Sequence, residues 1–173
     1  MWPGLIAGFA AGLWLLTFVA QALWQHSSAT ALMPATADGV PSVLVSKVVD
    51  GDSLEVLVNG KRFRVRLYGI DAPEWDQPWG SHSRDALARL VDRERVILQL
   101  EDVDNYGRQV ATVLLGEQNV NHEMIRTGNA WVYRRYNSDR SMVQQERQAR
   151  DLQLGLWQDA DPVPPWEWRR RKR

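Results

Sequence analysis

The most informative run of this sequence is Arg66-Leu67-Tyr68-Gly69-Ile70-Asp71-Ala72-Pro73-Glu74. Two shorter islands flank it, Asp50-Gly51-Asp52 before it and Asp104-Asn105-Tyr106-Gly107-Arg108 after it. Their carboxylates are the ligands that hard divalent cations such as Ca²⁺ prefer, and their arginines offer planar, permanently charged forks that suit a phosphate. The combination predicts a metal-dependent phosphodiesterase.

These three islands, in this order, resemble the staphylococcal nuclease (thermonuclease-like) family. The resemblance covers roughly residues 43–157, which is the size of one ordinary domain. A lone Asp-Gly-Asp would say little, because Asp-Gly is common in hairpin turns. The resemblance implies an α+β fold built on a small five-stranded OB-like β-barrel with about three helices.

Local patterns predict a matching set of elements. Asn59-Gly60, between the β-branched run Leu54–Val58 and the run Arg62–Leu67, is a strong hairpin signal. Alternation in the second run is expected to turn Phe63, Val65 and Leu67 toward the core and Arg62, Arg64 and Arg66 outward. The remaining patterns predict strands at Val43–Val49, Arg95–Leu100 and Gln109–Leu115, and helices at Ser81–Asp92, Asn119–Arg126 and Ser138–Leu152. Periodicity alone leaves barrel and sandwich open.

Composition and charge narrow the function classes. The 173 residues are 45% hydrophobic and 24% charged, as expected for a globular domain with extensions. The net charge is zero, but residues 169–173 are all basic, so the rest of the chain carries −5. This favours a local phosphate pocket over a surface that coats nucleic acid. Zero cysteines exclude disulfides and thiolate chemistry.

The N-terminal segment predicts export. Residues 2–24 contain no charged side chain, and a helix of that length, rising about 1.5 Å per residue, spans a bilayer core of roughly 30 Å. The expected organisation is therefore a signal or membrane-anchor segment (residues 1–24), a flexible linker (25–41), a nuclease-like domain (42–158) and a Pro/Trp-rich basic tail (159–173). Cleavage and retention of the segment stay open, so the domain is expected in the periplasm or outside the cell, or tethered to the membrane.

The resemblance also implies roles for individual residues. Asp52, Asp71 and the backbone carbonyl of Ala72 would hold Ca²⁺, with Asp50 as an outer carboxylate. The other assigned side chains would act on the substrate: Arg66 and Arg108 would clamp the phosphate, Glu74 would act as general base or orient the attacking water, and Tyr106 would contact the substrate or simply pack on the barrel.

Two further segments have open interpretations. Among the aromatic residues Trp131, Tyr133 and Tyr136, core packing is favoured for Trp131, while the others could stack on bases. In the tail, Pro162–Trp168 suggests docking against the body, and the basic end could attract nucleic acid or anionic lipid or remain solvated.

The sequence thus predicts a Ca²⁺-dependent endonuclease that cuts DNA and RNA with little sequence specificity, favours single strands and leaves 3′-phosphate ends. The alternative is a non-catalytic module of the same fold that binds nucleic acid or protein. No obligate protein partner is evident. Because the metal and phosphate positions are all present, the enzyme is the favoured hypothesis.

Overall fold

The computed structural model of the protein describes residues 41–137 and 139–172. The predicted signal or anchor segment and nearly all of the predicted linker lie outside the described residues, so both stay predictions. Across the part of the chain that is described, no helix is both long enough and apolar enough to cross a membrane.

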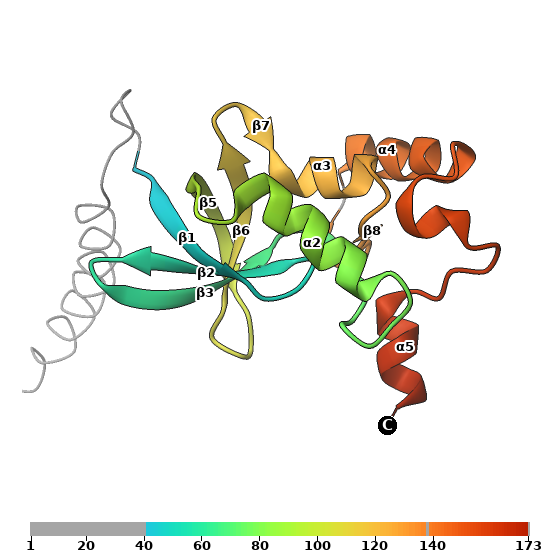
Figure 1. The fold of residues 1–173 in the computed structure, drawn as a ribbon, viewed down its shortest axis with the longest axis horizontal. Coiled ribbons are helices and arrows are strands. Elements are labelled where there is room, and N and C mark those ends of the chain that lie inside the picture. Colours follow the sequence, from blue (N-terminus) through green and yellow to red (C-terminus); the bar gives the residue numbers. More distant parts are fainter. Residues whose placement is uncertain (1–40, 138, 173) are drawn as a thin grey trace, which may run out of the picture. The chain divides into compact units, whose positions relative to one another are not determined.

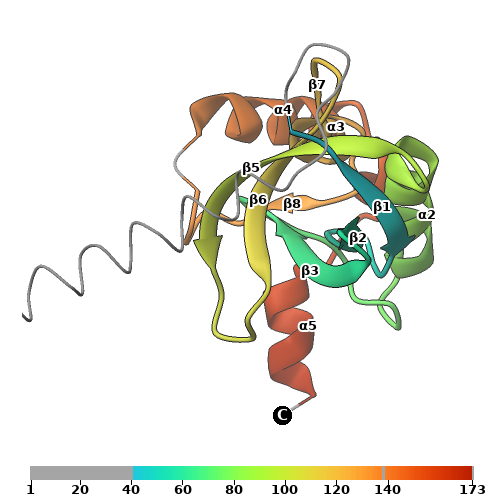
Figure 2. The same cartoon turned by 90° about the vertical axis from the view of Figure 1, so that its left-hand side faces the viewer.

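Five strands close into a barrel. Neighbouring strands pair in the order β3-β2-β1-β5-β6, and β3 also pairs in parallel with β6, which joins the two ends of the sheet (Figure 1). Figure 2 shows the strands curving around this ring. The barrel strands are β1 (Val43–Val48), β2 (Ser53–Val58), β3 (Lys61–Leu67), β5 (Arg95–Val103) and β6 (Gln109–Leu115). The predicted five-stranded OB-like α+β fold is confirmed.

The barrel interior is filled by aliphatic side chains that alternate along the strands. Nine of them are no more than 1% exposed: Val43, Val45, Leu54, Val56, Val65, Leu67, Val96, Ala111 and Val113. Full burial of a valine or leucine side chain stabilises a fold by about 1.5–3 kcal/mol, so this cluster supplies much of the driving force for closure.

The β2–β3 hairpin forms where the sequence predicts it. Asn59 and Gly60 both have positive φ, 50° and 76°, and this left-handed pair matches the twist of the strands that it joins. Alternation in β3 holds for Val65 and Leu67, but Phe63 is 43% exposed, so its predicted core position is wrong. The first four residues of β3 are all exposed, because this end of the hairpin extends beyond the packed interior.

The three predicted helices occur within two residues of their expected bounds, as α2 (Gly80–Val91), α3 (Val120–Arg126) and α4 (Arg140–Asp151). The chain then forms a 3₁₀ turn, η1 (Gly155–Gln158), and a last helix, α5 (Pro165–Arg171), neither of which was predicted. Three strands of two residues each were also missed: β4 (Ile70–Asp71), β7 (Gln118–Asn119) and β8 (Trp131–Val132).

A second, aromatic core lies outside the barrel. Trp131 and Trp157 meet edge to face with ring centroids 4.3 Å apart, and the guanidinium of Arg150 lies 3.9 Å from the Trp157 ring centroid. Trp79 and Trp166 pack against this cluster. It therefore connects β8, α4, η1 and α5, and the prediction that Trp131 is a core residue is confirmed.

A buried carboxylate ties α4 to β8. Glu146 is 1% exposed and accepts hydrogen bonds from the backbone N–H of Val132 (2.9 Å) and from the Arg134 side chain (2.6 Å). Glu146 is the only glutamate of α4, and nothing in the sequence indicated that it is internal. This contact fixes β8, which in turn pairs with β4.

Candidate active site

The first wall of the site is the turn from β1 into β2. Asp52, at its end, is 4% exposed, and its backbone N–H donates to the Asp50 carboxylate at 3.0 Å. Between them, Gly51 lies so close to α2 that a Cβ there would overlap the Ser83 hydroxyl, so only glycine fits. Burial, together with the neighbouring Asp52 charge, raises the pKa of Asp50 to about 7.

The second wall is β4. Asp71 is fully buried and pairs in register with Trp131 of β8, while the Tyr133 N–H donates to the Gly69 carbonyl at 2.8 Å. The next residue, Ala72, donates its N–H to Asp52 Oδ2 at 2.7 Å. This bond joins the two acidic turns directly, although they lie 20 residues apart in sequence.

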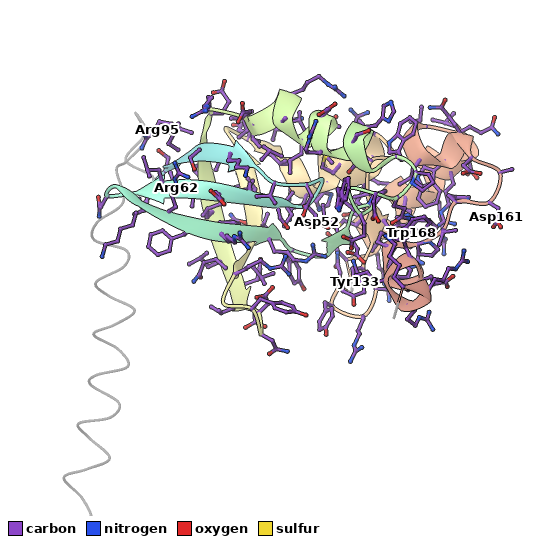
Figure 3. All side chains as sticks on the ribbon, turned by 60° about the horizontal axis from the view of Figure 1, so that its bottom comes forward. Asp52, Arg62, Arg95, Tyr133, Asp161 and Trp168 are labelled. Carbon is purple, nitrogen blue, oxygen red and sulfur yellow. The ribbon has the colours of Figure 1, made fainter. Side chains whose placement is uncertain are left out.

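Arg66, near the end of β3, bridges the two buried aspartates. One terminal nitrogen bonds Asp52 Oδ1, and the other bonds Asp71 Oδ1 at 2.9 Å and the Ile70 carbonyl at 3.2 Å. Alternation therefore points Arg66 away from the barrel interior, as predicted, but into a carboxylate cluster and not into solvent. Figure 3 shows the contrast with Arg62, which lies toward the distant end of the hairpin from Asp52.

The charges of this cluster perturb one another. Burial alone works against ionisation of Asp52, but the Arg66 charge and the Ala72 N–H hold its pKa below the ordinary value. Burial raises the pKa of Asp71 despite its bonds to arginine. The pKa of Arg66 lies above its usual range, because the two aspartates outweigh the effect of burial. Arg66 therefore stays charged at any working pH.

Glu74 lies at the open side of the cluster and has a partner that the sequence did not indicate. Arg169 of α5 places one terminal nitrogen 2.6 Å from Glu74 Oε1 and the other 2.7 Å from Asp71 Oδ2. The basic end of the tail therefore reaches the candidate site. The interpretation that this end remains solvated is wrong for Arg169. Only the Pro/Trp composition of residues 162–168 hinted at such docking.

Arg108 and Tyr106 lie on the β5–β6 hairpin, at one side of the cluster. Arg108 is paired with Asp104, Nε to Oδ2 at 2.7 Å, and approaches the Ser53 hydroxyl at 3.4 Å. Ser53 in turn donates to Asp52 Oδ1 at 3.0 Å, so Arg108 is linked to the carboxylates through one side chain. Tyr106 is 84% exposed and does not pack on the barrel.

Asp104 has none of the roles that the family resemblance implies, although it organises the hairpin. Its carboxylate accepts from the backbone N–H groups of Tyr106 (2.9 Å) and Arg108 (3.0 Å) as well as from the Arg108 side chain. The signal was present in the pattern Asp-Asn-Tyr-Gly, because an aspartate that opens a turn commonly accepts from the backbone that follows it.

The donors that could hold a divalent cation are oxygens. Within residues 41–137 and 139–172, no group of three or more His, Cys, Asp or Glu side chains could hold a metal ion. Asp52 and Asp71, however, share one guanidinium, so their carboxylates converge on one small volume. An all-oxygen pair of this kind fits Ca²⁺ chemistry, since Ca²⁺ completes its shell with carbonyls, waters and substrate. The Asp50 carboxylate lies next to this pair, where it accepts from the backbone N–H of Asp52.

Comparison with known proteins resolves the family. Residues 64–159 match the family model described as staphylococcal nuclease homologue. The chain belongs to the staphylococcal nuclease family. The matched range contains Arg66, Asp71, Glu74 and Arg108, while Arg169 lies beyond its end.

Bacterial relatives of this staphylococcal nuclease family member cover most of its length. An uncharacterized endonuclease of Escherichia coli O157:H7 is 45% identical over 129 residues, covering 74% of this chain and 84% of the relative. A micrococcal nuclease of Shigella flexneri is 41% identical, covering 80% of this chain and 84% of the relative. A probable staphylococcal-like nuclease of rice, CAN2, is 35% identical, and the match covers 34% of that protein.

Proposed function

We propose that this protein is a Ca²⁺-dependent endonuclease that hydrolyses phosphodiester bonds in DNA and RNA with little sequence specificity. The observation that carries the proposal is the convergence of Asp52, Asp71 and Glu74 on the forks of Arg66 and Arg169. Family membership and relatives named as nucleases support it.

Each side chain has a task in this reaction. Asp52 and Asp71, with the Ala72 carbonyl, would hold the cation, with Asp50 as an outer carboxylate. When bound there, Ca²⁺ would supply positive charge that offsets the negative charge of the phosphate. Arg66 and Arg108 donate to the other phosphate oxygens, and their charge stabilises the transition state.

Glu74 is the candidate for activating or orienting water, because its side chain is 35% exposed at the mouth of the cluster. The water oxygen forms a bond to phosphorus as the bond from phosphorus to the 5′ oxygen breaks, and Glu74 or solvent takes the water proton. The leaving 5′ oxygen gains a proton, which gives 3′-phosphate and 5′-hydroxyl ends. Single strands are the expected preference, with Tyr106 as a substrate contact.

We further propose that the domain works outside the cytoplasm, either released after export or tethered by residues 2–24. This rests on the uncharged N-terminal sequence. A non-catalytic module that binds nucleic acid or protein is the alternative function for the same fold.

The decisive test is cleavage of end-labelled single-stranded DNA and RNA by the full chain, with Ca²⁺ or with a chelator. We expect cleavage with Ca²⁺, none with the chelator, and 3′-phosphate ends. Glu74→Gln should lower kcat by about 10²-fold or more, since it removes a proton acceptor at nearly constant shape. Glu117→Gln, at an exposed turn, is the matched control.

Two outcomes would contradict the proposal in different ways. Products with 5′-phosphates would reject the mechanism but keep the enzyme. Folded protein that cuts neither substrate with any divalent metal, yet retains them in a gel-shift assay, would favour the non-catalytic module.

A further inference from the structure

Arg169 is the least expected residue of the site. Its guanidinium bonds both oxygens of Asp71, at 2.7 and 3.2 Å, and also Glu74 at 2.6 Å. It comes from α5, 98 residues after Asp71 in sequence. A cation that uses Asp71 as a ligand would therefore meet a positive charge already bound there.

The helix that carries Arg169 is held against the rest of the domain by several contacts. Trp166, one turn earlier, stacks on Tyr133 with ring centroids 5.7 Å apart and meets Trp131 edge to face. Trp168 Nε1 donates to Asp76 at 3.3 Å, and Lys172 forms an ion pair with the same carboxylate. Upstream of the helix, Gln77 Nε2 donates to the Val163 carbonyl at 2.6 Å.

A basic groove adjoins the same side chain. It encloses about 590 Å³ and is lined by Val132, Tyr133, Arg134, Arg135, Trp166, Arg169 and Arg170. Four guanidinium groups next to two aromatic rings suit the phosphates and bases of a nucleic acid strand. Figure 3 shows Tyr133 and Trp168 on this side of the molecule, near α5. Arg169 thus touches the catalytic carboxylates and also lines the groove.

We propose that Arg169 is a third active-site arginine, which neutralises Asp71 and Glu74 before a divalent cation binds and then transfers to a substrate phosphate in the adjoining groove. The cation displaces its guanidinium from Asp71, because both positive groups require the same oxygens. The side chain is 38% exposed, so it can rotate while α5 stays docked. This inference rests on the proposed function for its substrate, but its cation step can be measured separately.

Calorimetric titration of the metal-free full chain with Ca²⁺ tests the cation step without any substrate. Arg169→Gln keeps the length and polarity of the side chain and removes its charge. We expect Kd for Ca²⁺ to fall by about tenfold, since a competing unit charge beside the cation is gone. Arg171→Gln, an equal charge change on an exposed residue of the same helix, should leave Kd unchanged.

Arg169→Lys separates charge from packing. It keeps the positive charge, so Kd for Ca²⁺ should stay near that of the unmodified protein. Equal tightening in the Lys and Gln variants, an unchanged Kd in Arg169→Gln, or no Ca²⁺ binding by any of the proteins would overturn the competition. Thermal melts establish that each variant is folded.

Cleavage kinetics at saturating Ca²⁺ test the transfer to substrate. For a single-stranded oligonucleotide, Arg169→Gln should raise KM about tenfold, because one charge-assisted phosphate contact is lost, while Arg171→Gln leaves it unchanged. An unchanged KM in Arg169→Gln would overturn the transfer. If the unmodified protein cuts nothing, the proposed function and the transfer fail together, but the Ca²⁺ competition still stands or falls on the calorimetry.

Discussion

At the scale of single residues, Arg66 is the central positive charge of the buried carboxylate cluster. It is the shared partner of Asp52 and Asp71, whose side chains are 5% and 0% exposed. Two carboxylates so close together and so deeply buried repel one another unless a positive charge lies between them. In the structure, Arg66 supplies that charge.

Arg66→Ala should therefore destabilise the metal-free protein strongly. Removing one member of a buried ionic cluster typically costs about 3–5 kcal/mol of unfolding free energy. We expect Ca²⁺ to recover part of this loss, because a ligand that binds only the folded state stabilises it. Urea unfolding in chelator and in Ca²⁺ measures both effects.

The control for this change lies on the same strand. Arg62 is 73% exposed and lies 3.9 Å from Glu55, so Arg62→Ala should alter the unfolding free energy by no more than about 0.5 kcal/mol. Equal effects of the two substitutions would show that the buried cluster does not depend on Arg66.

Sequence and structure agree best at the residues of the three islands. The family resemblance implied that Asp52, Arg66 and Asp71 share one site, and Arg66 does bond both aspartates in the structure. Arg169 could not be predicted in the same way. Arg169 lies in a run of basic residues, and its partners Glu74 and Asp71 precede it by 95 and 98 residues in the sequence. No local sequence pattern could therefore indicate the contact.

At the scale of elements, long strands and helices were predictable and two-residue strands were not. The pair β4–β8 consists of four residues, too few for any periodicity. Its position is fixed by tertiary contacts such as the one from buried Glu146 to Val132. Strand β4, which orients Asp71, therefore depends on contacts with residues far away in the sequence. Asp71 itself could be identified from its motif.

The N-terminus of helix α4 is capped by a carboxylate whose ionisation can be tested. Asp139 is its N-cap and accepts from the Ser141 N–H at 2.7 Å, and the Ser141 hydroxyl lowers the pKa of Asp139 below its ordinary value. Ionisation of Asp139 therefore stabilises the folded state relative to the unfolded state. Its contribution is present above the pKa of the unfolded chain, near 3.8, and is lost as pH falls through the lower folded pKa.

Asp139→Ala should lower the unfolding free energy at neutral pH by about 0.5–2 kcal/mol, the usual effect of losing an N-cap. Asp139→Asn keeps the acceptor but cannot titrate, so it should lose less at neutral pH and show a shallower decline below about pH 4. Urea unfolding at several pH values checks this. Identical acid profiles for Asp139→Asn and the unmodified protein would contradict the assignment.

At the scale of the whole molecule, the barrel core and the aromatic core meet at the candidate site. The barrel supplies Asp52 and Arg66, and the aromatic core beside it positions Asp71 through β8 and Arg169 through α5. Figure 1 shows α5 on the opposite side of the domain from α3 and α4. The last helix is therefore a structural part of the folded domain.

Trp166→Ala tests that view. Loss of contacts with Trp131 and Tyr133 should cost about 2–3 kcal/mol of unfolding free energy, less than for a fully buried tryptophan because Trp166 is only partly buried. Trp75→Ala, at a residue 82% exposed, is the matched control and should have little effect. Equal stability of the two variants in urea would mean that α5 contributes nothing to the fold.

The pairing of β3 with β6 also governs how fast this protein can reach its native state. That pairing, the Gln77–Val163 bond across 86 residues and the Asp71–Arg169 pair across 98 all join remote parts of the chain. Each must overcome the entropy of closing a long loop before its energy is gained. Domains with such topology refold in milliseconds to seconds, and we expect the contact across the longest loop, Asp71–Arg169, to form last. A refolding population should thus regain its barrel before it regains its active site.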